Sequence, residues 1–144
     1  MIRPPLHECM LDVAKILARR ATCAKLAVGC VLVDESGRVL GTGYNGVPYD
    51  FVHCTEVLCK GATMPAGSDT CEAVHAEQNA LFGVDPYRVY TCYTTHAPCL
   101  RCTKMLLNTS CELLVYEATP FEGASLWNRA GRRTLIFDRH LHSV

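Results

Sequence analysis

The chain has 144 residues, of which 49% are hydrophobic and 19% are charged, and its 14 basic residues equal its 14 acidic residues in number. This composition is typical of a globular protein, and we expect residues 1–144 to form one domain with its own core. A formal charge of zero argues against general electrostatic attraction to nucleic acid or to a membrane surface. We therefore expect neither as a partner.

The cysteine content bears on the compartment. The chain has ten cysteines, its first residues do not resemble a secretion signal, and no apolar stretch has membrane-spanning length. These features favour a cytoplasmic protein with reduced thiols. The cysteines are then better interpreted as metal ligands and small buried residues than as disulfides.

The first half of the chain predicts a helix, a hairpin and a long loop. Apolar residues at helical spacing predict a helix over about residues 6–20. Two strands joined by a polar turn are expected at 28–33 and 38–44. The segment 45–70 is rich in Gly, Pro and polar residues and is too long for a simple connector, so we expect it to have a function.

In the second half, helices and strands alternate. Helices are expected near 72–83, 98–108 and 123–130, and strands near 88–95, 112–116 and 133–138. Strands separated by single helices indicate crossover connections and parallel pairing. The predicted fold class is α/β, a three-layer α/β/α sandwich with a mixed sheet of about five strands. Functional residues are then expected where helices begin at the carboxyl edge of the sheet.

Two short motifs combine the residue types of a catalytic zinc site. His75 and Glu77 form a His-x-Glu pair, and Pro98-Cys99-Leu100-Arg101-Cys102 follows about two dozen residues later. One imidazole and two thiolates leave the fourth position of a zinc tetrahedron open, and a nearby carboxylate can move protons there. Cys99 and Cys102 are three apart, so both thiols would lie in the first turn of one helix, where the helix dipole favours thiolate. An intracellular Cys-x-x-Cys can also be a redox pair, but a redox pair does not require a distant His-x-Glu.

The spacing of His75 and Glu77 constrains their place on a helix. Residues two apart point to opposite sides of a regular helix, so these two can converge only at a helix end. A short helix beginning near Glu72 would place both in its early turns.

Gly41, Gly43 and Gly46 form the pattern G-x-G-x-x-G, which is also the fingerprint of dinucleotide-binding folds. The fingerprint requires a helix directly after the last glycine. Here Val47-Pro48 follows, which cannot open such a helix, and we reject the dinucleotide interpretation.

His-x-Glu followed by Pro-Cys-x-x-Cys matches the known signature of zinc deaminases. Over about residues 6–137 the chain resembles the deoxycytidylate (dCMP) deaminases, within the cytidine deaminase fold. The segments that carry the resemblance are Val28-Gly29, Gly43-Tyr44-Asn45-Gly46-Val47-Pro48, His53-Cys54, His75-Ala76-Glu77-Gln78-Asn79-Ala80 and Thr94-Thr95-His96-Ala97-Pro98-Cys99-Leu100-Arg101-Cys102.

The resemblance implies a reaction and its principal residues. His75, Cys99 and Cys102 would bind the catalytic Zn²⁺, and Glu77 would shuttle protons. The implied reaction is hydrolytic deamination of dCMP to dUMP with release of ammonia, which supplies dUMP for dTMP synthesis.

Further residues are candidates for substrate binding. Asn45 would grip the sugar or base, or be only a turn residue; Tyr116 would stack on the base, or pack in the core. Backbone groups near Ala76 and Cys99 would hold the base edge. A 5′-phosphate would meet amides near Asn45 and Gly46, assisted by His96 or by a cation such as Lys25. The alternative for His96 is that it only satisfies the loop.

The resemblance also implies a second, structural zinc and an oligomer. Its ligands would be Cys23, Cys54, Cys59 and Cys71, the alternative being unpaired thiols. A homo-oligomer, and specifically a hexamer, is implied, with dCTP and dTTP as effectors and Mg²⁺ as a companion of the regulatory nucleotide.

Two other functions remain open. One is a deaminase of another substrate, such as 5-substituted dCMP, dCTP, a free nucleobase or a tRNA adenosine, although an RNA reader would be expected to have a basic surface. The other is a structural zinc module that binds a macromolecule. A closed structural site would need a fourth protein ligand, whereas Glu77 suggests a general base.

Overall fold

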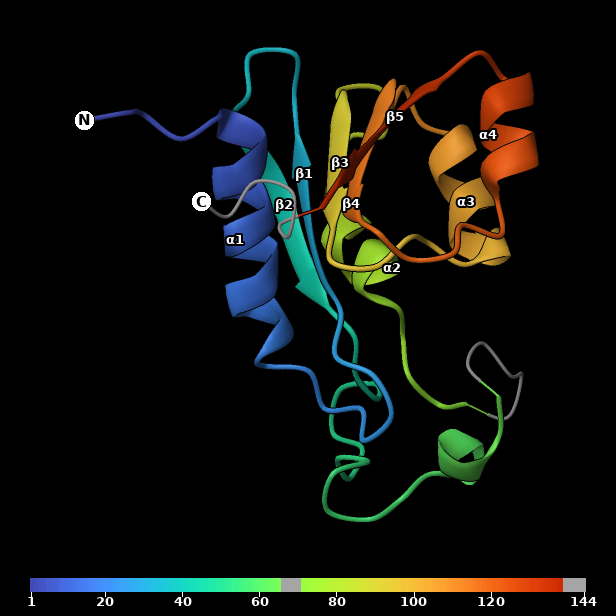
Figure 1. Ribbon diagram of the computed structural model, residues 1–144. Helices are drawn as coiled ribbons and strands as arrows, with labels where there is room; N and C mark the ends of the chain where they lie inside the picture. Colours follow the sequence, from blue (N-terminus) through green and yellow to red (C-terminus); the bar gives the residue numbers. More distant parts are fainter. Residues whose placement is uncertain (66–70, 139–144) are drawn as a thin grey trace.

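A mixed five-stranded sheet is the centre of the computed structural model, which describes residues 1–65 and 71–138 (Figure 1). In chain order the elements are α1 (Leu6–Ala18), β1 (Gly29–Val33), β2 (Val39–Tyr44), the 3₁₀ helix η1 (Lys60–Thr63), α2 (Ala76–Leu81), β3 (Thr91–Thr94), α3 (Leu100–Leu107), β4 (Leu113–Glu117), α4 (Ala124–Arg129) and β5 (Arg133–Phe137). The predicted order of helices and strands is confirmed.

The sheet has the strand order β2-β1-β3-β4-β5. β1 pairs antiparallel with both β2 and β3, whereas β3, β4 and β5 are parallel. A hairpin followed by parallel strands with helical crossovers is therefore confirmed.

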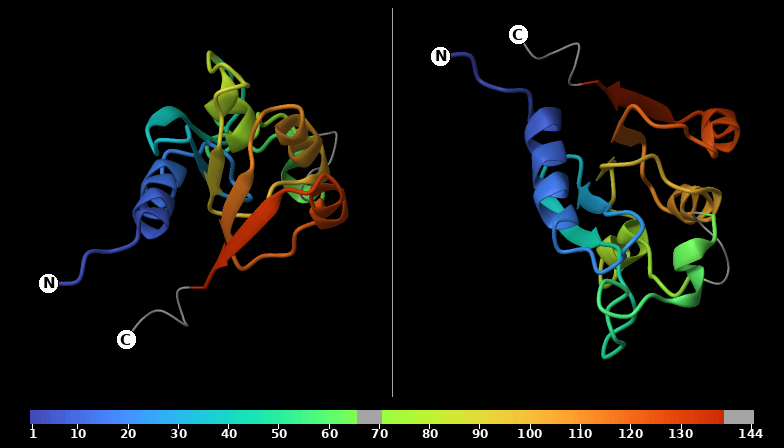
Figure 2. Two further views of the ribbon diagram at one scale, coloured as in Figure 1. Left: turned by 90° about the horizontal axis from the view of Figure 1, so that it is seen from above. Right: turned by 60° about the horizontal axis from the view of Figure 1, so that its bottom comes forward.

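Helices cover both faces of the sheet, and β1 shows why. All five of its residues are buried, so successive side chains must enter opposite cores. Val31 and Val33 pack with Leu11 and Ala14 of α1 on one face, while Cys30 and Leu32 belong to the core under the other helices. Figure 2 shows α1 on one side of the strands and α3 and α4 on the other. The predicted three-layer sandwich is confirmed.

The glycines of the G-x-G-x-x-G pattern allow a helix to approach a strand closely. A Cβ on Gly43 would lie 2.3 Å from the carbonyl oxygen of Ala76, and one on Gly41 would lie 2.3 Å from that of Ala80. Glycine at these β2 positions therefore lets the backbone of α2 rest directly on the strand.

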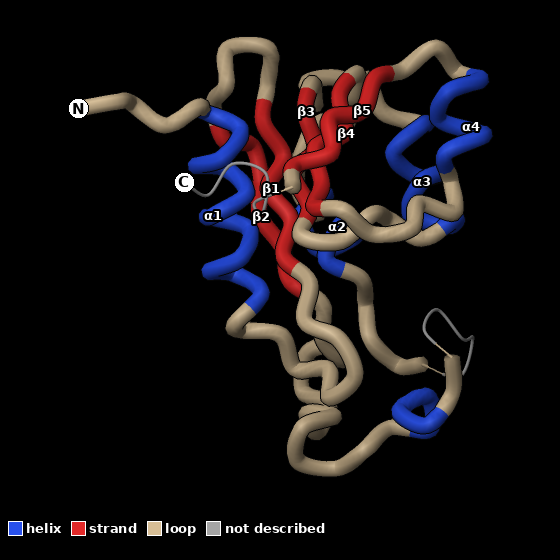
Figure 3. The backbone as a smooth tube through the Cα atoms, in the orientation of Figure 1, coloured by secondary structure: helices blue, strands red, loops and turns tan. Residues whose placement is uncertain are grey.

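The long loop between β2 and α2 extends below the sheet and contains η1 (Figure 3). The predicted loop reached residue 70, and its last part, 66–70, lies outside the described residues. The helix predicted to begin near Glu72 begins instead at Ala76, and that prediction is wrong. The cause is a long-range pairing, because Val74 exchanges two backbone hydrogen bonds with Gly46, of 2.7 and 3.1 Å, which keep the chain extended.

The described helices are short. The longest, α1, has 13 residues, and within residues 1–65 and 71–138 no helix has the length and apolar character of a membrane span.

Candidate active site

Three side chains from the two motifs converge at the edge of the sheet. His75 Nδ1 lies 3.5 Å from Cys99 Sγ and 3.3 Å from Cys102 Sγ, and the ligand atoms all lie within 4.8 Å of one another. Ligand atoms of tetrahedral zinc, at about 2.0–2.3 Å from the metal, are separated by comparable distances. The donor set and its compactness therefore fit a zinc ion.

The cluster forms because two helices begin beside each other. His75 is the N-cap of α2, and its backbone N–H donates to Gln78 Oε1 at 2.8 Å. Cys99 is the N-cap of α3, and its Sγ accepts from the backbone N–H of Cys102 at 3.5 Å. This is the helix-start arrangement that the spacing of the two motifs predicts.

The electrostatics of the cluster favour a thiolate even before a cation is considered. The Cys102 thiol donates a hydrogen bond to Cys99, which, with the nearby His75, holds the pKa of Cys99 at about 4. The same bond, with burial, raises the pKa of Cys102, and the Cys99 sulfur raises the pKa of His75. The three groups share protons that a bound divalent cation would displace.

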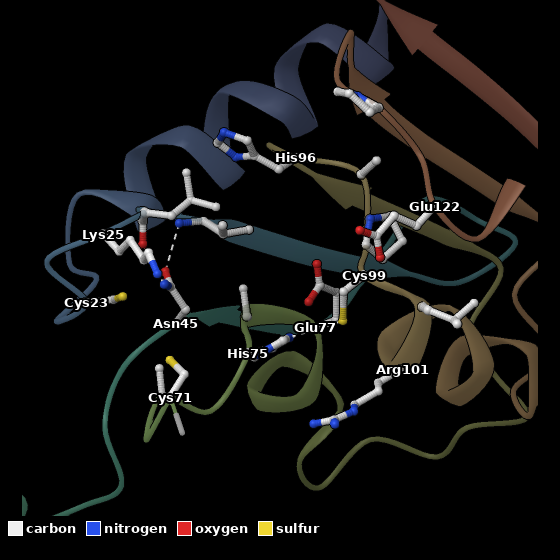
Figure 4. Close-up of a pocket in the computed structure, with 18 of the residues that line it drawn as sticks. Cys23, Lys25, Asn45, Cys71, His75, Glu77, His96, Cys99, Arg101 and Glu122 are labelled. Carbon is white, nitrogen blue, oxygen red and sulfur yellow. Dashed lines mark hydrogen bonds between the residues drawn. The ribbon is translucent and has the colours of Figure 1, made fainter. Parts of the chain in front are cut away.

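Glu77 lies at the centre of this arrangement, as the second residue of α2. Its side chain is 4% exposed, and burial raises the pKa of its carboxyl group. The Thr94 hydroxyl lies 3.3 Å from Glu77 Oε1. Figure 4 shows the carboxylate beside Cys99, with His75 nearby. A buried carboxyl group with a raised pKa next to a metal site is a candidate for proton transfer.

A cavity of about 460 Å³ opens onto the cluster (Figure 4). Its volume falls within the range of small-molecule sites, about 300–1,000 Å³. Apolar wall residues are Leu26, Val28, Ala97, Pro98, Leu100 and Pro120, and charged residues at the wall are Lys25, Arg101, Lys104 and Glu122. The site thus combines an apolar slot with basic groups.

The structure brings Asn45, Ala76 and His96 to this cavity but not Gly46. Both polar atoms of the Asn45 side chain are engaged with the adjoining loop, because Oδ1 accepts from Val28 N at 2.8 Å and Nδ2 donates to the Leu26 carbonyl at 2.6 Å. The N–H of Gly46 donates to Val74. Asn45 therefore holds the cavity wall in place.

Tyr116 does not line the cavity. It is 4% exposed in the core under α2, α3 and α4, where its ring packs edge-on against Phe121 with centroids 5.5 Å apart. The structure therefore matches the alternative of a packed strand residue.

The four other cysteines form a looser group. Cys23 and Cys71 line the cavity, and the Cys59 N–H lies 3.5 Å from Cys54 Sγ. Among the residues that the structure describes, only His75, Cys99 and Cys102 form a metal-ligand group of three or more with all ligand atoms within 4.8 Å. The second site is thus not preformed as the first is.

Sequence reasoning missed Arg101, Lys104 and Thr94. Arg101 and Lys104 are three apart on α3, directly after Cys99, and that spacing was a usable signal for a basic wall. Thr94 was not identifiable, because its contact with Glu77 joins two separate elements.

Comparisons with known proteins agree with this geometry. Residues 5–118 match the family model for the cytidine and deoxycytidylate deaminase zinc-binding region. The deoxycytidylate deaminase of Mycobacterium phage D29 is 36% identical over 125 residues, covering 81% of this chain and 97% of that protein. The enzyme of the same name from Schizosaccharomyces pombe is 34% identical over 124 residues, covering 81% of this chain.

The relatives differ in length. The chain spans 38% of the S. pombe protein and 39% of the Saccharomyces cerevisiae deoxycytidylate deaminase. A crystal structure of the dCMP deaminase from the cyanophage S-TIM5 in complex with dCMP and dUMP superposes with a TM-score of 0.74 at 23% identity, covering 95% of this chain and all of that one. The cyanophage structure shows a shared fold. The matched family model and the phage D29 relative establish that the chain belongs to the cytidine and deoxycytidylate deaminase zinc-binding family.

Proposed function

We propose that the protein is a zinc-dependent hydrolase that converts dCMP to dUMP and ammonia. The observation that carries this proposal is the compact His75, Cys99 and Cys102 group with buried Glu77 beside it, at the wall of a nucleotide-sized cavity. The names of the relatives support the choice of dCMP. A structural zinc site is closed by four protein ligands and does not require a buried carboxyl group at the wall of an open cavity.

The chain's own residues account for the proton movements. Zinc, when bound at His75, Cys99 and Cys102, would lower the pKa of water so that hydroxide is available near neutral pH. Glu77 accepts one proton of the attacking water and passes it to ring N3 of the cytosine while the water oxygen bonds to C4. Glu77 then takes the proton of the new C4 hydroxyl and passes it to the exocyclic nitrogen, so that the C4–N bond breaks, C4=O forms and ammonia leaves. Backbone groups around Ala76, at the cavity wall, hold the base edge.

The 5′-phosphate is assigned to the basic wall. Gly46 donates its N–H to Val74, so the amides first expected to bind phosphate are not its best partners. Lys25, Arg101 and Lys104 line the cavity, and charge-assisted hydrogen bonds from such groups favour a phosphate. His96 also lines it and remains a candidate contact.

Ammonia release from purified protein tests the reaction. The substrates are dCMP, deoxycytidine, dCTP, 5-methyl-dCMP, a free nucleobase and tRNA, with Glu77→Gln as the control for contaminating deaminases. We expect the highest kcat/KM with dCMP, at least about tenfold above deoxycytidine, because one charge-assisted hydrogen bond contributes about 1.5–3 kcal/mol. Equal values for the two would contradict a phosphate site, and no release from any substrate would contradict the function.

Lys104→Gln tests the phosphate assignment, with Arg88→Gln as its matched control. Both changes remove one positive charge, but Arg88 is exposed and pairs with Asp34 away from the cavity, at 3.7 Å. We expect Lys104→Gln to lower kcat/KM for dCMP and to leave that for deoxycytidine unchanged. An equal effect on both substrates would contradict the assignment.

The resemblance also supports a second zinc and an oligomer. Cys23, Cys54, Cys59 and Cys71 supply four thiols for a structural zinc, and the chain would close around the ion when it binds. The resemblance implies a homo-oligomer, specifically a hexamer. Its activity would respond to dCTP and dTTP, with Mg²⁺ accompanying the triphosphate. Two zinc ions per chain, an oligomer in light scattering and altered rates with each triphosphate are the expected results; one zinc, a monomer or unchanged rates would each remove the corresponding part.

A further inference from the structure

The side chain of Thr94 connects two parts of the site. Thr94 is the last residue of β3 and is fully buried. Its hydroxyl lies 3.3 Å from Glu77 Oε1 and 2.9 Å from the carbonyl oxygen of His96, in the segment that leads to Cys99. One hydroxyl thus bridges the acid of α2 and the backbone before α3.

The position of this hydroxyl is fixed by the sheet. β3 lies in the interior of the sheet, and Thr94 pairs with Cys30 of β1 on one side and with Tyr116 of β4 on the other. A β-branched side chain at such a position has few rotamers. Glu77, by contrast, has a long side chain on a helix of only six residues.

We propose that Thr94 is a positioning residue for Glu77, an inference that rests on the proposed deaminase function. Its hydroxyl holds one carboxyl oxygen, so that the other is directed toward the proton that Glu77 transfers. The single hydroxyl proton is shared between this carboxyl oxygen and the His96 carbonyl, which also restrains the hydroxyl. A catalytic acid or base must be held within a few tenths of an ångström of its productive geometry, which requires such support.

A purely structural role for Thr94 makes a different prediction. If its hydroxyl only satisfied the His96 carbonyl, its loss would lower stability and leave turnover unchanged in the folded fraction. A positioning role instead lowers kcat with little change in KM, because substrate binding does not depend on the orientation of Glu77.

The experiment compares Thr94→Val and Thr94→Ser with a matched control, Thr91→Val. Thr91 is at the other end of β3 and is 4% exposed, so the same substitution removes a buried hydroxyl from the same strand away from Glu77. The measurements are kcat and KM for dCMP, zinc per chain and melting temperature. We expect Thr94→Val to lower kcat about 10- to 100-fold with KM within about twofold, since a hydrogen bond to a charged group is lost. Thr94→Ser should restore kcat to within about threefold of the wild type, and Thr91→Val should leave it unchanged.

Several outcomes would overturn the inference. Wild-type kcat in Thr94→Val would do so, as would a loss of kcat that follows zinc loss or that Thr91→Val reproduces. If Thr94→Val does not fold, Thr94→Cys, which keeps a similar size but offers a weaker donor, takes its place with the same expected loss of kcat. An inactive wild type would refute the proposed function itself, whereas an active wild type with an equally active Thr94→Val refutes only the role of Thr94.

Discussion

The molecule contains two groups of potential zinc ligands, and they differ in how the fold holds them. In the first group, His75, Cys99 and Cys102, the ligand atoms lie within 4.8 Å of one another at two helix starts beside the interior strands. In the second, Cys54 and Cys59 belong to the long loop, and the four thiols do not meet that criterion. The first group is one histidine and two cysteines, and the second is the four cysteines Cys23, Cys54, Cys59 and Cys71. The backbone that carries the ligands makes the difference.

The largest expected effect separates the two groups directly. Cys102→Ser removes a ligand from the compact group and should abolish both the catalytic zinc and the activity, because a thiolate contributes much of the affinity. Cys59→Ser should leave at least about half of the activity and reduce only the second zinc, since Cys59 lies outside the catalytic group. Elemental analysis and deamination of dCMP measure both. Equal loss of activity in the two variants would show that the loop group is as essential as the compact one.

Glu77→Gln sharpens the comparison within the compact group, by separating proton transfer from metal binding. Glutamine has nearly the same shape but cannot accept the proton, so kcat should fall about 10²- to 10⁴-fold while zinc content and melting temperature stay near wild type. Kinetics and elemental analysis on the same preparation check this. Turnover within about tenfold of wild type would contradict the assigned role of Glu77.

Gly43→Ala tests whether the compact group depends on backbone packing. The added Cβ would lie 2.3 Å from the Ala76 carbonyl and 2.4 Å from Ala80 N, so α2, which carries His75 and Glu77, must shift. We expect a loss of about 1–3 kcal/mol in the free energy of unfolding, together with lower kcat. Thr42→Ala, at the exposed neighbouring position of β2, is the control and should change stability by less than about 1 kcal/mol. Wild-type stability and kcat in Gly43→Ala would show that α2 can shift without disturbing His75 and Glu77.

The same contrast explains what the sequence could predict. The order of elements and the mixed sheet follow from local periodicity, and the meeting of His75 with Cys99 and Cys102 was expected from the deaminase signature; the structure shows all three. The start of α2 did not follow, because it depends on the pairing of Gly46 with Val74, which are 28 positions apart in the sequence. Periodicity contains no information about such long-range pairing.

Side-chain direction was equally hidden. Tyr116 belongs to a run of three buried residues in β4, and its ring packs against Phe121 in the core and not in the cavity. For Asn45 the sequence indicates a polar residue in a loop, while its partners, Leu26 and Val28, become evident only when the two loops are folded together. Tertiary contacts that the local sequence pattern does not specify decide both cases.

The smallest predicted effect concerns the protonation of His96, which lies at the wall of the cavity. Burial lowers the pKa of this imidazole, against an opposing influence from the Glu117 carboxylate, and its Nδ1 lies 3.1 Å from the Thr95 hydroxyl. Because the pKa is lower in the folded than in the unfolded state, the unfolded chain binds more protons as the pH falls below about 6.5. The associated stability is present above that pH and is lost as the pH falls through the lower folded pKa.

Between pH 7 and 5, wild-type protein should therefore lose slightly more stability than His96→Asn, by at most about 2 °C in melting temperature. Metal loss at low pH affects both proteins, so the quantity to compare is the difference between their two pH-induced shifts. A shift that is larger in His96→Asn than in the wild type would mean that His96 is held more firmly in its protonated form by Glu117 than burial disfavours it.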